Sequence, residues 1–137
     1  MARILSSGLF GATQAGGTNN AGAFFDLTPT LGGSWNFSVL LDFDGPVPSG
    51  SYRTLTLGRD GNFYGTTSND GPNQQGSVFK LTFANGAWSY TTLYSFTGGT
   101  DGGLPYGMLA VDGSDNIYGT ASVGGAYGKG VVFQIAP

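Results

Sequence analysis

A repeat of 54 residues is the feature that most restricts how this chain can fold. The string "NFYGTT", which begins at Asn62, returns as "NIYGTA" at Asn116, and a looser copy, "GLFGAT", begins at Gly8. The glycine inside the motif holds the same place in each copy, as Gly11, Gly65 and Gly119. Three copies in a fixed register are very improbable by chance, so the chain uses one structural unit repeatedly.

Three further strings recur, and two of them keep this register. A phenylalanine string occurs as "AFFDLTP", "VFKLTF" and "VFQIAP", with equivalent residues at Phe25, Phe79 and Phe133. A tryptophan string occurs as "SWNFSVLLDF" at 34–43 and "AWSYTTLYSF" at 87–96. The last string, "RTLTLGRDG" at 53–61 and "GMLAVDGSD" at 107–115, precedes the glycine motif.

Each string has the pattern of a β-strand. In the second tryptophan string the larger side chains stand at every second position: Trp88, Tyr90, Thr92, Tyr94 and Phe96. The first copy alternates in the same way from Trp35 to Phe43. A period of two is typical of a strand whose alternate side chains share a face. We therefore expect Trp35 and Trp88 to pack in the core or between sheets.

The fold class predicted from these strings is all-β, a β-propeller made of four-stranded antiparallel blades. In the middle unit the four strands are expected at 53–58, 62–68, 77–83 and 88–96. Short Asp/Gly/Asn turns such as "GRDGN" suit the first hairpin. A repeat near 50 residues with four antiparallel strands is typical of a propeller blade, which must stack on neighbouring blades to bury both faces.

The chain holds about two and a half to three such blades within a single repeat domain, 1–137. The expected blades cover 1–43, 53–96 and 107–137, with Ala2 to Leu5 as a short innermost strand of the first blade and no outermost strand in the third. Propellers usually have about 4–8 blades. We therefore expect the ring to be completed by oligomerisation, with six blades in a homodimer or nine in a homotrimer.

The strings resemble the repeats of bacterial tandem-repeat proteins known as GloVer-containing proteins. The resemblance rests on "FYGTT" at 63–67, "GSVFKL" at 76–81 and the run from Trp88 to Phe96, and it covers nearly the whole chain. It implies a propeller with kelch-like blades, in a protein that is secreted or exposed at the cell surface. Natural members carry more repeats in one chain, so a fragment, a designed unit and a small self-assembling protein all remain open.

Composition narrows the function. The chain has no Cys and no His, all eight acidic residues are Asp, and no recurring pair of carboxylates converges. We therefore predict no catalytic residue, no enzyme activity and no cofactor. A metal site at Asp112, Asp115 and Asn116 is a weaker interpretation than a hairpin turn. Five scattered cations offer no surface for nucleic acid, and no run is long enough for a signal peptide or a membrane span.

Binding residues, if any, are expected in the long loops, which a meander of four strands gathers on one face of a propeller. The candidate ligand-binding residues are Asn19, Asn20, Tyr52, Asn69, Asp70, Asn73, Gln74, Asp101, Tyr106 and Tyr127. Tyrosine rings and amide or carboxylate groups suit a carbohydrate, but the same polar residues are what loops need for turn geometry.

Two functions follow from the sequence. The first is a non-catalytic self-assembling scaffold or display module, and the alternative is a glycan-binding, lectin-like module. The loops share little beyond glycine, which favours the scaffold because a multivalent lectin would keep its ligand residues in each copy.

Overall fold

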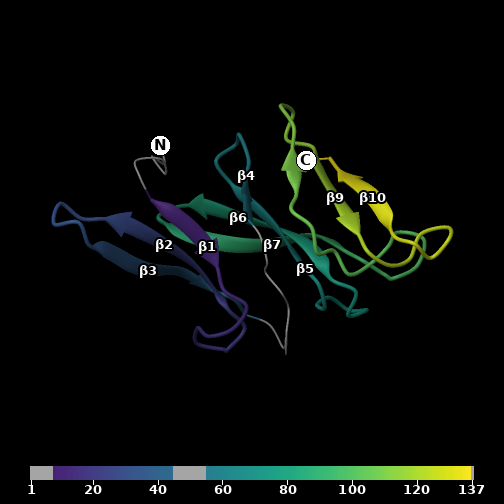
Figure 1. The fold of residues 1–137 in the computed structure, drawn as a ribbon, viewed down its shortest axis with the longest axis horizontal. Coiled ribbons are helices and arrows are strands. Elements are labelled where there is room, and N and C mark those ends of the chain that lie inside the picture. Colours follow the sequence, from purple (N-terminus) through teal and green to yellow (C-terminus); the bar gives the residue numbers. More distant parts are fainter. Residues whose placement is uncertain (1–7, 45–54, 137) are drawn as a thin grey trace.

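Three antiparallel β-sheets follow one another along the chain in the computed structural model, which describes residues 8–44 and 55–136 (Figure 1). The first sheet contains β1 (Leu9–Ala12), β2 (Ala23–Pro29) and β3 (Trp35–Asp42). The middle sheet contains β4 (Leu55–Leu57), β5 (Phe63–Thr67), β6 (Ser77–Ala84) and β7 (Ala87–Ser95). The third contains β8 (Ala110–Val111), β9 (Ile117–Ala121) and β10 (Val131–Ile135). The predicted all-β, antiparallel class is confirmed.

Strand order in the middle sheet is β4-β5-β6-β7, the meander expected from the repeat. The first and third sheets have three described strands each, and the short strand expected at Ala2 to Leu5 lies outside the described residues. No helix long and apolar enough to cross a membrane occurs in 8–44 or 55–136.

A β-bulge occurs in β7 and again in β3, which are the outer strands of their sheets. It interrupts the regular alternation expected from the sequence. Phe79 pairs with Thr92 but Val78 pairs with Tyr94, so Leu93 is an extra residue in β7. Leu40 is the extra residue at the equivalent place in β3. A bulge places one more residue on its strand than on the partner, which breaks the period of two.

The bulge divides the second tryptophan string, from Trp88 to Phe96, between two neighbouring sheets. Trp88 packs on Phe24 of the first sheet, with ring centroids 4.9 Å apart. Beyond the bulge, Phe96 packs on Phe133 of the third sheet, with centroids 5.1 Å apart. One run of alternating aromatic residues therefore contacts the sheet before it and the sheet after it.

Two apolar clusters hold the three sheets together. The cluster between the first and middle sheets contains six buried residues, Ala21, Phe24, Phe43, Phe63, Phe79 and Leu81. The cluster between the middle and third sheets contains Tyr64, Val78, Phe96, Leu109 and Ile117. The middle and third sheets are also joined by a hydrogen bond, because the Thr56 hydroxyl of β4 donates at 2.8 Å to the carbonyl of Leu109, the residue just before β8.

The recurring glycine lies beneath a phenylalanine ring of its own sheet. A Cβ built on Gly119 would stand 2.4 Å from the ring of Phe133, and one on Gly11 would stand 2.5 Å from the ring of Phe25. Gly65 and Phe79 are likewise paired across β5 and β6. The glycine therefore recurs because a cross-strand ring occupies the space of its side chain.

Candidate functional site

Three long loops pack against one another beside the middle and third sheets. The Leu104 amide donates to the Gln75 carbonyl at 2.7 Å, which joins the loop at 97–105 to the loop at 68–76. Gly103 and Val123 form an isolated bridge, and the Gly125 amide donates to the Gly99 carbonyl at 2.8 Å. Loops that the sequence separates therefore form one surface.

Most of the polar side chains predicted as ligand-binding hold their own loops in shape. Asn19 donates to Asp44 at 2.5 Å, and Asn20, at a positive φ of 54°, accepts from the Gly16 amide at 3.0 Å. Asp70 accepts from the hydroxyls of Thr67 and Ser77.

Polar candidates further along the loop at 68–76 and in the loop at 97–105 also serve the geometry of their loops. Asn73 donates to the Phe96 carbonyl at 3.5 Å, and Gln74 takes a positive φ of 54°. Asp101 accepts from the Tyr94 hydroxyl and the Thr97 amide, both at 2.9 Å. Hydrogen bonds from Thr97 first, and then from Tyr94, hold the pKa of Asp101 below its usual range.

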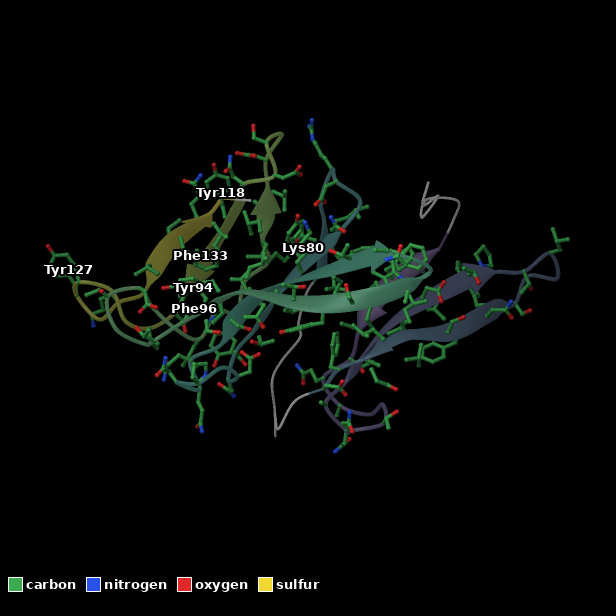
Figure 2. All side chains as sticks on the ribbon, turned by 180° about the vertical axis from the view of Figure 1, so that it is seen from behind. Lys80, Tyr94, Phe96, Tyr118, Tyr127 and Phe133 are labelled. Atoms are coloured by element: carbon green, nitrogen blue, oxygen red, sulfur yellow. The ribbon has the colours of Figure 1, made fainter. Side chains whose placement is uncertain are left out.

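The candidate tyrosines do not converge on one place. Tyr127 is 90% exposed and projects from the tip of the loop at 122–130 (Figure 2). Tyr106 is exposed in the segment that leads to β8, and Tyr52 lies outside the described residues. Asn69, the remaining candidate, lies in the loop at 68–76 next to Asp70.

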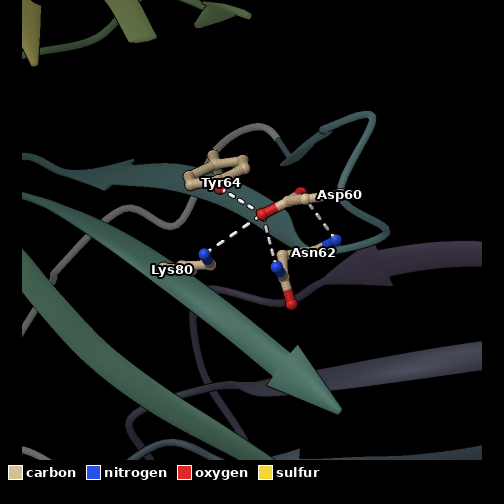
Figure 3. Close-up of polar contacts among 4 residues, drawn as sticks. All are labelled: Asp60, Asn62, Tyr64 and Lys80. Carbon is tan, nitrogen blue, oxygen red and sulfur yellow. Dashed lines mark hydrogen bonds and ion pairs between the residues drawn. The ribbon is translucent and has the colours of Figure 1, made fainter. Parts of the chain in front are cut away.

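The strongest polar cluster lies at the turn between β4 and β5 (Figure 3). Asp60 accepts a hydrogen bond from the Tyr64 hydroxyl at 2.7 Å and forms an ion pair with Lys80 at 3.1 Å. Asn62 donates to the same carboxylate through its amide side chain and its backbone. Partial burial would raise the pKa of Asp60, but these hydrogen bonds outweigh it and hold the pKa well below its ordinary value.

The third sheet repeats this cluster at the turn between β8 and β9. Asp112 accepts from the Asn116 side chain at 2.8 Å and from the Tyr118 hydroxyl at 3.1 Å. Hydrogen bonds from Asn116 and the Ser114 amide lower the pKa of Asp112 to about 2. Because both carboxylates clamp a hairpin turn, the cluster is architectural. Sequence reasoning found the Asp and Asn of these turns but missed Lys80, which reaches across from β6. The described residues contain no group of three or more side chains placed to hold a metal ion.

The front face of the first sheet carries an uncovered apolar surface. We use "front face" for the side of each sheet that bears Leu9, Phe63 or Ile117. On the first sheet Trp35 is 52% exposed and Phe37 is 60% exposed, and Val39 and Leu9 are exposed beside them. Within one copy of the chain, the prediction that Trp35 packs in the core or between sheets is therefore wrong, because no sheet of the described residues lies against this face.

Equivalent residues on the front faces of the other two sheets are covered. Phe63 and Ile117, the counterparts of Leu9, are buried between sheets, and Trp88, the counterpart of Trp35, packs on Phe24 and Phe63. The exposed front face thus has the composition of a buried contact.

The rear face of the third sheet, which is the side opposite its front face, is also uncovered. Val132 is 80% exposed, and Met108 is exposed on the segment leading to β8. The counterparts of Val132 in the other two sheets, Phe24 and Val78, are fully buried. The described chain therefore ends, at each side, on a face that its own repeats bury elsewhere.

In the comparison with protein families, residues 4–137 match a model described as the Gloeobacter/Verrucomicrobia repeat. The chain belongs to this family. No curated protein and no solved structure matched the chain. The suspected GloVer repeat is confirmed, and membership of the Gloeobacter/Verrucomicrobia repeat family accounts for the three copies in fixed register.

In this member of the Gloeobacter/Verrucomicrobia repeat family, a groove of about 380 Å³ lies between β7 and the outer edge of β10. Tyr94, Phe96 and Asp101 line one wall, and Val131 to Ile135 line the other. Figure 2 shows Tyr94 and Phe96 close to Phe133 at the join of the middle and third sheets. The groove and the two uncovered faces are the surfaces that the described structure offers to a partner.

Proposed function

We propose that this chain is a non-catalytic, self-assembling repeat module whose sheets are blades of a β-propeller. Copies would associate head to tail, with the front face of the first sheet in one copy against the rear face of the third sheet in the next. A ring of six blades needs two copies, and a ring of nine needs three. In this role the module is a scaffold that displays its loops.

One observation carries the proposal. The residues exposed on the two outer faces are repeat counterparts of residues buried between the sheets. Phe24 of the first rear face packs on Phe63 of the middle front face, with centroids 5.3 Å apart. The counterparts of this pair on the outer faces are Val132 and Leu9, both exposed. A head-to-tail contact would therefore repeat an arrangement that the chain already forms within itself.

The hydrophobic effect supplies the driving force. Burying a large apolar side chain contributes roughly 1.5–3 kcal/mol relative to leaving it exposed. Monomeric proteins rarely leave a continuous apolar surface of this kind uncovered. Trp35, Phe37, Val39 and Leu9 together form such a surface on one sheet.

Two charge-introducing variants test the proposal. We expect the unmodified chain to have a native mass two or three times that of one chain by light scattering. Phe37→Asp, on the front face, and Val132→Asp, on the rear face, should each reduce it. Both side chains are exposed within one copy, so neither variant should unfold the sheets.

Mixing the two variants distinguishes a head-to-tail contact from a symmetric one. Phe37→Asp keeps an intact rear face and Val132→Asp keeps an intact front face. An equal mixture should therefore form a heterodimer in which these two unaltered faces meet. If front faces instead met front faces, Val132→Asp would have no effect and mixing would rescue nothing. A folded chain with the mass of a single copy at high concentration would contradict the proposal.

A glycan-binding module is the second candidate, and Tyr127 favours it. A fully projecting aromatic ring on a loop tip is suited to stacking on a sugar face. Against it, Asn19, Asn20, Asp70 and Asp101 are engaged in loop hydrogen bonds. Binding to one sugar class on a glycan array, lost in Tyr127→Ala, would support the lectin and argue against a pure scaffold.

The family resemblance also supports a secreted or cell-surface location for the natural protein. Fractionation of producing cells checks this, since recovery in the cytosolic fraction alone would contradict it.

A further inference from the structure

The outer edge of β10 carries no strand in the part of the chain that the structure describes. β10 pairs with β9 on one side, in order β10-β9-β8. Its repeat counterparts β2 and β6 each pair with an outer strand as well, β3 and β7. An edge strand presents a row of N–H and C=O groups that can pair with an added strand.

The groove beside this edge is lined by part of an aromatic cluster. Between the first and middle sheets, three rings meet: Tyr90 stacks on Phe79 at 4.9 Å and meets Phe43 at 6.0 Å, and Phe43 meets Phe79 at 6.2 Å. Between the middle and third sheets, Phe96 and Phe133 repeat the pair formed by Phe43 and Phe79. Among the described residues, no ring equivalent to Tyr90 covers this second pair.

The position that a ring equivalent to Tyr90 would occupy lies in the groove. Tyr90 belongs to the outer strand β7, and the equivalent strand of the third sheet would lie along β10. The groove is lined on that side by Val131 to Ile135, and Phe96 lies opposite. The vacant space therefore adjoins both the unpaired backbone edge and the two rings that a tyrosine would cover.

We propose that the β10 edge and its groove form an acceptor site for an extended strand of the β7 type, supplied by a second repeat polypeptide. The strand would pair antiparallel with β10 and place its tyrosine, two residues after its tryptophan, against Phe96 and Phe133. The inference rests on the proposed function in treating the three sheets as equivalent units. It does not require the head-to-tail contact, because Val132 lies on the opposite face of β10 from Phe133.

A peptide with the sequence of residues 87–96, labelled with a fluorophore and extended by two lysines for solubility, tests the site. We use the full chain carrying Phe37→Asp, which lies on the first sheet away from β10, so that the proposed self-association does not compete. Fluorescence anisotropy should show saturable one-to-one binding. A peptide with Trp88→Ser and Tyr90→Ser keeps the backbone but loses the aromatic contacts, so its affinity should be lower by a factor of at least about ten.

Hydrogen exchange locates the bound peptide. Backbone amides of β10 should exchange about tenfold more slowly in the complex, because strand pairing protects them, while amides at the edges of β3 and β7 should not change. Thr100→Trp in the chain, at an exposed position that lines the groove, should block binding by filling it.

The outcomes separate the two proposals. Absence of saturable binding, binding without protection of β10, or binding that Thr100→Trp leaves intact would each overturn the acceptor site. The native mass of the Phe37→Asp chain reports independently on head-to-tail association. A chain that loses association but still binds the peptide supports both proposals.

Discussion

The ring of Phe96 packs against the ring of Phe133 at 5.1 Å, and this contact repeats the one between Phe43 and Phe79 in the preceding pair of sheets. In each case a phenylalanine just after the bulge of an outer strand contacts the third strand of the following sheet. The repeat thus preserves contacts between sheets as well as the strands inside them.

Phe96→Ala should destabilise the fold strongly, because Phe96 is fully buried between two sheets. Large-to-small changes of this kind cost about 3–5 kcal/mol. The free energy of unfolding in urea measures the effect, and Phe37→Ala is the matched control. Phe37 is exposed, so its loss should cost less than about 1 kcal/mol in the Val132→Asp background, where association is removed. Equal costs for the two variants would contradict the assignment of the core.

Acid should weaken the clamp at the turn between β4 and β5. The folded-state pKa of Asp60 is depressed from its ordinary value of 3.8. The stability that this carboxylate contributes is therefore present above about 3.8 and is lost as the pH falls toward the folded-state pKa. The pKa of Asp112 is lowered to about 2, so its contribution disappears over the same acidic range.

Urea unfolding of Asp60→Asn between pH 2 and pH 6 checks this. The variant should be less stable than the unmodified chain at pH 6, and the difference should shrink as the pH falls. Tyr64→Phe removes one hydrogen bond to the carboxylate and should show a smaller change of the same sign. A difference independent of pH would mean that the charge of Asp60 plays no part.

Gly119→Ala should destabilise the third sheet. Its Cβ would lie 2.4 Å from the ring of Phe133 and 2.7 Å from the side chain of Leu109. Displacing these packed groups should cost about 1–3 kcal/mol. Gly32→Ala is the control, since nothing lies within 4 Å of its Cβ and its φ is not positive. A lower midpoint of thermal unfolding for Gly32→Ala than for Gly119→Ala would refute the explanation of the recurring glycine.

Deleting Leu93 should leave the third sheet coupled to the middle one. Thr92 and Tyr94 already pair with the consecutive residues Phe79 and Val78, so the deletion only makes the ladder regular and keeps Phe96 on the same face. Deleting Ser95 instead moves Phe96 by one position and turns it toward the other face of the sheet. Hydrogen exchange should then accelerate in β9 and β10 more than in β1 and β2, and equal acceleration in both deletions would contradict the assignment of Leu93 as the extra residue.

The strands and their antiparallel order could be predicted from the sequence alone. The 54-residue register and the alternation of large and small residues reflect local strand geometry, which the residues nearby in the chain determine. For the same reason "FYGTT" was recognisable as a strand, and the turn residues of "GRDGN" and "DGSDN" were recognisable as hairpins.

The candidate site was less predictable. Composition identified Asn19, Asp70 and Asp101 as polar loop residues, but it did not show which groups they bind. Asn19 pairs with Asp44, 25 residues along the chain, whereas Asp70 and Asp101 bind groups within or beside their own loops. Only the folded loops show that these side chains are used to hold the loops together. Lys80 was missed because an ion pair across two strands has no local signal.

Only the tertiary structure decides which neighbouring sheet packs on each face of a given sheet. The alternating run from Trp88 to Phe96 carries no sign that Leu93 is an extra residue, because a bulge depends on pairing with β6. Likewise, Trp35 and Trp88 are equivalent in sequence, yet only Trp88 has a neighbouring sheet to cover it. The sequence by itself determined the repeating strand unit, and the packing of one sheet on the next determined which surfaces remain for a partner, since burial depends on what lies opposite.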